Sequence, residues 1–149
     1  MAFSKVLRRA AFVRKLKRLP KVARKLIRKA VAESADEMVS LMKSLVPVSP
    51  GGGTLRDSID WTWGKPPPGV ISLGEVVSTD VTLTATIFAG SPLNRAERKG
   101  AFYARWVEHG TVQRTAQPYF FVSYRALRGP AKRRISRSFT KAAKLVARR

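Results

Sequence analysis

The spacing of hydrophobic residues predicts a long helix in the first third of the chain. After Pro20, apolar residues recur at steps of three and four from Ala23 to Leu45, which is the period of an amphipathic helix. The pattern stops before Pro47, so we expect a helix of about 25 residues, about 40 Å long. Residues 1–19 follow helical spacing less regularly, and Pro20 is placed where it restarts or kinks a helix.

The central part of the chain has the pattern of strands. Glycines and prolines mark loops in residues 46–53 and 64–69. Between and after these loops the pattern predicts half-buried strands in residues 54–63, 70–80 and 81–90. The last of these alternates apolar residues with threonines, which indicates one packed face and one freer face. Three successive strands with short connections favour an antiparallel meander.

The last third of the chain is predicted to be helical. Residues 101–109 suit a short helix, with Gly110 as its C-terminal stop. Three aromatic side chains of this segment are candidates for facing the sheet: Phe102, Trp106 and Tyr103. Pro118 is placed to open a final helix in its first turn. We expect Gly129 and Pro130 to break or bend that helix, which then resumes to the C-terminus.

These elements together predict an α+β fold. It consists of a long N-terminal helix, a small antiparallel sheet of three to four strands, a short helix and a C-terminal helix. The length of 149 residues suits one folded unit. We divide it into a basic helical arm (1–32), an α+β core (33–124) and a basic C-terminal helix (125–149) packed on the core or extending from it.

The positive charge is concentrated at the two ends of the chain, which has a net charge of +21. Residues 1–32 carry twelve Lys or Arg and no acid, and residues 125–149 carry ten and no acid. Such segments repel each other unless an anionic partner neutralises them. We therefore expect contact with a polyanion or an acidic partner through Arg8, Arg9, Arg14, Lys15, Lys17, Arg18, Lys21, Arg24, Arg133 and Arg134.

No group of residues suggests catalysis, a metal or a cofactor. The single histidine, His109, follows Glu108 and could be a general base, but no nucleophile accompanies it, so a structural role at a helix end is favoured. The glycines at 51–53 lack the Lys-Ser/Thr pair of a phosphate-binding loop. The chain has no cysteine, and its carboxylates are scattered. Four of them could form a carboxylate pair, Asp57 and Asp60 beside Glu75 and Asp80, but their turn and strand-edge positions favour ordinary solvated side chains.

The aromatic residues allow two interpretations. Trp61, Trp63 and Trp106 could stack on nucleic-acid bases, although packing in the core is the commoner use of tryptophan on strands and short helices. The run Tyr119-Phe120-Phe121 suits the core and could also anchor a subunit contact.

Membrane and targeting functions are weaker alternatives. No stretch approaches the roughly 20 apolar residues of a transmembrane helix. Basic residues interrupt the first 19 positions, which argues against a secretory signal and leaves a mitochondrial-type presequence as a minor possibility. An amphipathic membrane contact would use a set of apolar residues near the N-terminus: Phe3, Leu7, Phe12, Leu16 and Leu19.

Four separated pieces of the sequence together resemble one family. They lie in residues 47–59 (Gly53, Leu55 and Arg56), 103–111 (Tyr103, Glu108 and Gly110), 117–121 (Pro118) and the closing helix with Ala126. This order is similar to the neck or tail-component proteins of long-tailed bacteriophages, related to the minor tail protein Z group and also found in gene-transfer particles. The resemblance covers about residues 30–145. The chain departs from it in the extra glycines, the Pro66–Pro68 loop and the very basic first 30 residues.

The resemblance implies a non-enzymatic virion subunit at the head–tail junction, present in the host cytoplasm during assembly. It would form a ring, which we expect to be a hexamer, next to connector and tail-tube or tail-terminator proteins. Basic helices repeated around that ring would hold double-stranded DNA without reading its sequence, or would dock on acidic faces of neighbouring rings. No membrane contact is implied.

The resemblance also suggests structural roles for its motif residues. Leu55 and Ile59 would pack inward while Arg56 reaches Glu108. The backbone turns would be set by three residues: Gly53, Gly110 and Pro118. The main alternative function is a free-standing, sequence-nonspecific nucleic-acid-binding protein, which would act without forming a ring.

Overall fold

The computed structural model describes residues 21–48, 52–72, 83–91 and 101–147. Predictions that fall on residues 1–20, 49–51, 73–82, 92–100 and 148–149 lie outside this part of the chain. The elements in chain order are α2 (Lys21–Leu45), α3 (Thr54–Asp57), β1 (Asp60–Trp63), β2 (Ile71–Ser72), β3 (Ala85–Ala89), α4 (Ala104–His109) and α5 (Phe120–Ala147). This order confirms the predicted α+β fold and the 25-residue helix that ends before Pro47.

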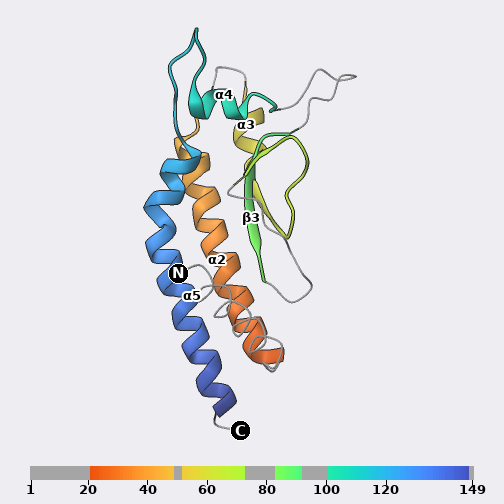
Figure 1. Cartoon of the computed structure of the whole chain (residues 1–149), viewed down its shortest axis with the longest axis vertical. Helices are drawn as coiled ribbons and strands as arrows, with labels where there is room; N and C mark the ends of the chain where they lie inside the picture. The colour runs from red at the N-terminus through yellow and green to blue at the C-terminus, as the bar shows by residue number, and fades with distance from the viewer. Residues whose placement is uncertain (1–20, 49–51, 73–82, 92–100, 148–149) are drawn as a thin grey trace, which may run out of the picture.

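The two long helices, α2 and α5, form an antiparallel hairpin along the length of the molecule (Figure 1). The sheet contacts α2 on one side, and α3 and α4 lie at one end of the hairpin (Figure 1). We call this end the α4 end, and the opposite end, where α2 begins and α5 finishes, the distal end. The expected boundaries after residues 32 and 124 lie inside α2 and α5.

The main core lies between the hairpin, the sheet and the short helices. Met42, Ile59, Tyr119 and Phe120 are fully buried there, together with Ile87 of the central strand. A second, smaller cluster near the distal end is built on Ala23, Ile27 and Ala142. Small alanine side chains let the two helix backbones approach closely at this point, so the hairpin stays paired beyond the sheet.

The sheet is antiparallel, as predicted, but it is not a meander. The strand order is β1-β3-β2, with Asp60 opposite Phe88 on one side of β3 and Ile71 opposite Ala89 on the other. The connection from β1 to β2 contains Pro66–Pro68, which have no N–H groups for a strand ladder. The chain therefore does not form a β1–β2 hairpin, and β2 pairs with the far edge of β3.

The second face of β3 is also less free than its sequence indicates. Thr86 is buried, and its hydroxyl donates a hydrogen bond to the carbonyl oxygen of Gly64. The segment after β1 therefore covers part of the face that the alternation assigned to solvent. The predicted strand start at residue 54 is wrong as well, because Thr54–Asp57 form one helical turn that buries Leu55.

The short helix α4 packs through only part of the predicted face. Tyr103, one of the three candidates, packs against the core together with Val107. Phe102 and Trp106 remain 44% and 54% exposed, so they are not buried as core residues. Residues four apart share a face of a helix, so Tyr103 and Val107 point inward together while Phe102 and Trp106 share the neighbouring, outer face.

The sequence predicts a break or a bend at Gly129 and Pro130. The break is wrong, because the C-terminal helix is continuous through both residues. Pro130 removes one backbone donor from the helix ladder, and the carbonyl left without it belongs to Ala126. Ala126 is exposed, so water can satisfy that carbonyl. Pro118 lies two residues before the first helical residue, Phe120, and therefore outside the first turn.

Candidate nucleic-acid and assembly interfaces

The distal half of the hairpin is a single cationic surface. Antiparallel pairing places the start of α2 beside the end of α5, as the contact of Ala23 and Ile27 with Ala142 shows. Residues 21–32 and the whole of α5 contain no Asp or Glu. Ten exposed cations lie on the distal parts of these segments, residues 21–32 and 131–147: Lys21, Arg24, Lys25, Arg28, Lys29, Lys132, Arg133, Arg137, Lys141 and Lys144.

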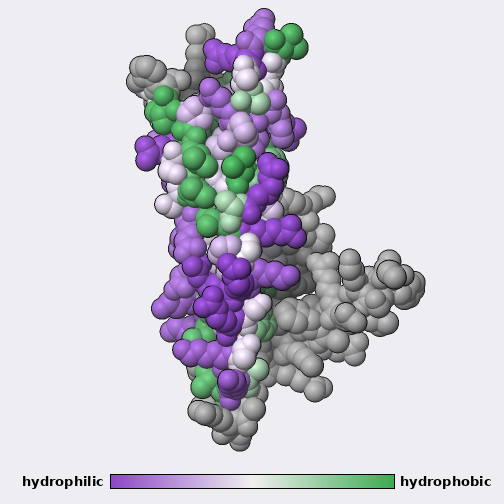
Figure 2. Space-filling view, turned by 90° about the vertical axis from the view of Figure 1, so that its left-hand side faces the viewer, coloured by the Kyte–Doolittle hydropathy of each residue, from purple (hydrophilic) through white to green (hydrophobic). Residues whose placement is uncertain are grey.

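Figure 2 shows the α5 side of the molecule, where the lower half is mostly hydrophilic and hydrophobic residues gather in the upper half. The described parts of the two basic segments, residues 21–32 and 125–147, thus lie on the same helical hairpin. A helical hairpin with this charge suits contacts with phosphate groups. Such contacts position a protein on DNA but carry no sequence information.

Some cations of the hairpin are held by other side chains of the chain. Arg134 donates from Nη1 to Glu37 Oε2 at 2.8 Å and to Ser34 Oγ at 3.2 Å, and its Nη2 pairs with Glu37 Oε1. This hydrogen bonding lowers the pKa of Glu37 and raises the pKa of Arg134. The Arg28 guanidinium lies 4.6 Å from the centroid of the Trp63 ring, a cation–π distance.

These contacts separate the predicted contact residues into groups. Lys21, Arg24 and Arg133 are exposed on the distal surface, whereas Arg134 is half-buried and joins α5 to α2. Six of the predicted residues lie outside the described part of the chain: Arg8, Arg9, Arg14, Lys15, Lys17 and Arg18.

At the α4 end, Glu108 holds the start of α5. Its side chain is only 4% exposed, and Oε2 accepts hydrogen bonds from the backbone nitrogens of Tyr119 and Phe120, both at 2.8 Å. Oε1 accepts a third from Phe121 at 3.0 Å. The first turn of α5 has no acid of its own. Glu108 therefore acts as the cap of a helix that its sequence leaves uncapped.

The predicted pairing of Arg56 with Glu108 is wrong. Within the described residues no ion pair joins them, and Arg56 is exposed on α3. The sequence carried one signal for the true partner. The segment before Phe120 lacks Ser, Thr, Asp or Asn at the cap position, so the helix needs an acceptor from elsewhere.

Residues 110–118, which we call the finger, project beyond α4 at the top of Figure 1. Gly110 ends α4 with φ of 77°, which confirms the predicted stop. A Cβ there would lie 2.8 Å from the backbone nitrogen of Ala116, so the finger folds back closely on its own start. Thr111 and Arg114 exchange backbone hydrogen bonds of 2.9 and 3.2 Å, and Gln117 donates to Val107 at 2.9 Å.

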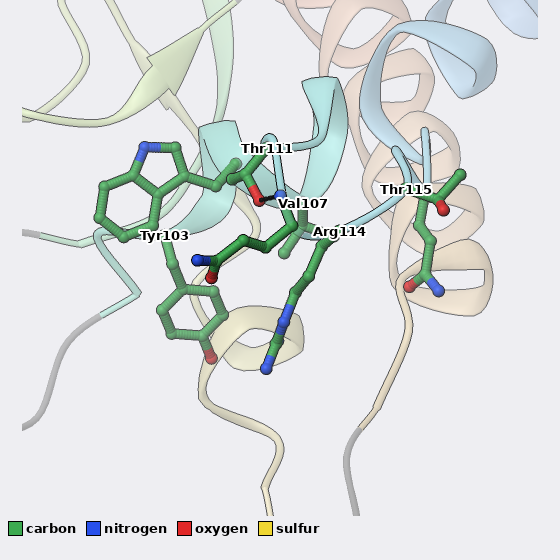
Figure 3. Close-up of a pocket in the computed structure, with 8 residues that line it drawn as sticks. Tyr103, Val107, Thr111, Arg114 and Thr115 are labelled. Carbon is green, nitrogen blue, oxygen red and sulfur yellow. Dashed lines mark hydrogen bonds between the residues drawn. The ribbon is translucent and has the colours of Figure 1, made fainter.

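A hollow of about 580 Å³ lies between α4 and the finger (Figure 3). The side chains of Tyr103 and Arg114 extend to the same side of it, and Thr115 lies at its other side (Figure 3). Its lining contains no acid, histidine or cysteine, and its ionisable side chains are those of Tyr103 and Arg114. Among the described residues there is no group of three or more potential metal-ligating side chains.

The remaining candidates have structural contacts. The His109 ring lies 5.9 Å from that of Phe121 at the end of α4. The indole nitrogen of Trp61 donates to Asp36 at 2.7 Å, which ties β1 to α2. In the described part of the chain, the buried Tyr119 hydroxyl makes no hydrogen bond. Burial, and then the nearby charge of Glu108, raises the pKa of Tyr119.

A family model with the description "Bacteriophage HK97-gp10, putative tail-component" matches residues 10–110, which is more than half of the chain. The chain belongs to the HK97-gp10-like family. The matched residues include α2, the sheet and α4 with Glu108 and Gly110. The comparisons with curated proteins and with solved structures gave no match.

Membership in the HK97-gp10-like family makes the chain a phage tail-type structural protein, which places it in a virion with other virion proteins as neighbours. This agrees with the resemblance of the sequence to phage tail-component proteins. In the part of the chain that the structure describes, each helix is too short or too polar to cross a membrane.

Proposed function

We propose that this HK97-gp10-like protein is a neck subunit that forms a ring, a hexamer, where the head and tail of a phage-like particle join. In this proposal it is related to the minor tail protein Z group and to the equivalent proteins of gene-transfer particles. The distal half of the α2–α5 hairpin faces the double-stranded DNA that passes through the ring. The protein acts by binding and has no catalytic role.

The observation that carries the proposal is the union of two acid-free segments in one surface. Ten exposed cations on one end of a hairpin repel one another, and this repulsion is relieved when an anionic partner binds. Duplex DNA presents about one negative charge per 1.7 Å of its axis, so several phosphates can meet one hairpin. Lys21 and Arg24 on α2 and Arg133 on α5 are well placed for such contacts.

Contacts of this kind suit a protein that must hold any DNA sequence. They depend on counterion release and on position, so they grip the backbone without selecting bases. The tryptophans of β1 support this interpretation, because Trp61 and Trp63 are engaged by Asp36 and Arg28 within the subunit. For these two tryptophans, phosphate contact by the neighbouring cations is favoured over base stacking.

The same surface could instead dock on acidic faces of neighbouring connector, tail-tube or tail-terminator proteins. Cryo-electron microscopy of the native particle distinguishes the two arrangements. We expect a ring at the head–tail joint, with the start of α2 and the end of α5 directed at the DNA density. A ring with the distal ends turned toward protein would overturn the DNA role. Absence of the chain from the particle would favour the free-standing nucleic-acid-binding protein instead.

A further inference from the structure

The finger is held rigidly at both of its ends. Just after the finger, the backbone nitrogens of Tyr119 and Phe120 donate hydrogen bonds to Glu108. Near the end of the finger, the backbone nitrogen of Gln117 donates to the carbonyl oxygen of Val107 in α4. Inside the finger, the Thr111–Arg114 pair closes a narrow turn. A loop with this many internal bonds loses little conformational entropy on binding, because its shape exists before a partner arrives.

This rigid segment and its neighbour α4 present large apolar side chains to solvent. Val112, at the turn of the finger, is fully exposed. Trp106 and Phe102 are about half exposed and lie edge-to-face, with ring centroids 5.4 Å apart. Exposed aromatic residues next to apolar ones are typical of protein interfaces, and tryptophan is among the residues that contribute most binding energy there.

The α4 end carries both a protruding and a receiving feature. The protruding feature is the tip of the finger with Val112, and the receiving feature is the hollow between the finger and α4, lined in part by Trp106 and Thr115. Two different surfaces on one subunit can join head to tail, and such contacts close into a ring when the rotation between subunits allows it.

Charge decides which partner this end suits. Residues 104–118 carry two exposed arginines and one buried glutamate, whereas the distal surface carries ten exposed cations. Two copies of the chain repel strongly at their distal ends, so a contact between copies is favoured at the α4 end. An acidic partner would be drawn to the distal surface instead. The α4 end is apolar and carries much less charge than the distal surface, so it suits a second copy of the chain.

We propose that neighbouring copies join through this end, with the finger tip and Val112 of one copy seated in the hollow beside Trp106 of the next. This inference rests on the proposed ring and identifies the contact that builds it. It also orients each subunit, because contacts at the α4 end leave the distal surfaces available for DNA.

Disulfide cross-linking tests the contact, because the chain contains no cysteine. Val112→Cys places a thiol at the tip, and Thr115→Cys places one at the hollow; both positions are exposed. The purified variants, one with a size tag, are mixed and oxidised at about 1 M salt, where the Debye length is only about 3 Å. We expect a disulfide-linked heterodimer of the two variants. Monomers, or homodimers of Val112→Cys only, would overturn the proposal.

A second substitution checks that the cross-link reports a specific contact. Adding Trp106→Ser to the Thr115→Cys variant should lower the heterodimer yield about tenfold or more, since it removes the apolar wall of the hollow. Leu145→Ser, at an exposed apolar position near the distal end, is the matched control and should leave the yield unchanged. Equal heterodimer yields with Trp106→Ser and with Leu145→Ser would contradict the inference. A ring seen in the particle without the heterodimer would remove this contact and retain the proposed function.

Discussion

Glu108 caps the helix that begins at Phe120, although the two residues belong to different elements. Its carboxylate lies 2.8 Å from the Phe120 backbone nitrogen and accepts two further N–H groups. The arrangement satisfies donors that a helix start leaves unpaired, and it places a negative charge at the positive end of the α5 dipole. It also closes the finger, because the capping residue and the capped helix lie on its two sides.

Replacement of Glu108 by glutamine should destabilise the fold. The amide retains one acceptor oxygen, and its NH₂ group would face backbone N–H groups, so buried donors lose their partners. We expect a loss of about 2 kcal/mol, or roughly 4 to 8 °C in melting temperature. The control is Glu33→Gln, which removes an exposed 3.9 Å pair with Lys29 and should shift melting by less than about 2 °C. Equal shifts would contradict the capping role.

Alanine substitutions at two glycines should change the stability of the fold in opposite directions. Gly110→Ala forces a residue with a Cβ into φ of 77° and sets that Cβ 2.8 Å from the Ala116 nitrogen. We expect a loss of about 1–3 kcal/mol. Gly129→Ala, inside α5 with nothing within 4 Å of the added atom, should stabilise by about 0.5–1 kcal/mol. Chemical denaturation measures both, and a stabilising Gly110→Ala would show that the finger does not require this turn.

Tyr119→Phe should not weaken the fold. The Tyr119 hydroxyl is buried and, in the described part of the chain, has no hydrogen-bond partner, so its burial carries an uncompensated desolvation cost. Removing it leaves the packed ring in place. We expect an unchanged melting temperature or a gain of up to about 1 kcal/mol in unfolding free energy. A loss above about 1 kcal/mol would mean that the hydroxyl does form a stabilising bond.

The Arg134–Glu37 pair predicts a specific pH dependence. Hydrogen bonding to Arg134 lowers the pKa of Glu37 from its ordinary value of 4.5. A carboxylate with a lowered pKa stabilises the fold above its unfolded pKa, and this contribution is lost as pH falls through the folded pKa. The difference in melting temperature between the wild type and Glu37→Gln should therefore be present at pH 7 and shrink as the pH falls below 4.5. A difference that persists or grows in acid would contradict the pair.

The elements with strong local patterns were predictable from sequence. The apolar residues from Ala23 to Leu45 follow helical spacing without interruption, and β3 alternates clearly, so both were found. Gly110 also marked the end of α4 correctly, because a positive φ favours glycine. Pro130 does not end α5 as a proline can, because a proline signal is local whereas α5 packs along α2.

Features that depend on tertiary contacts were not predictable in the same way. The strand order depends on which strand pairs with the two-residue strand Ile71–Ser72. A segment this short has almost no pattern of apolar and polar residues from which its pairing could be predicted. The sequence indicates Glu108 as a motif residue but suggests Arg56 as its partner, because its backbone partners are signalled only indirectly, by the missing capping residue before Phe120. The common cationic surface likewise depends on the antiparallel pairing that brings Ala23 to Ala142.

The central claim, that the distal surface contacts DNA phosphates, is tested most directly by the salt dependence of DNA binding. The measurement compares the wild type with a distal triple variant (Arg24→Gln, Lys141→Gln and Lys144→Gln) and with a control of equal net charge at the α4 end (Arg56→Gln, Arg105→Gln and Arg114→Gln). All six positions are exposed. We expect the plot of log K against log salt to become less steep by roughly 2 to 3 in the distal variant. The steepness should be nearly unchanged in the control. Equal slopes for the two variants, or an affinity insensitive to salt, would contradict the account.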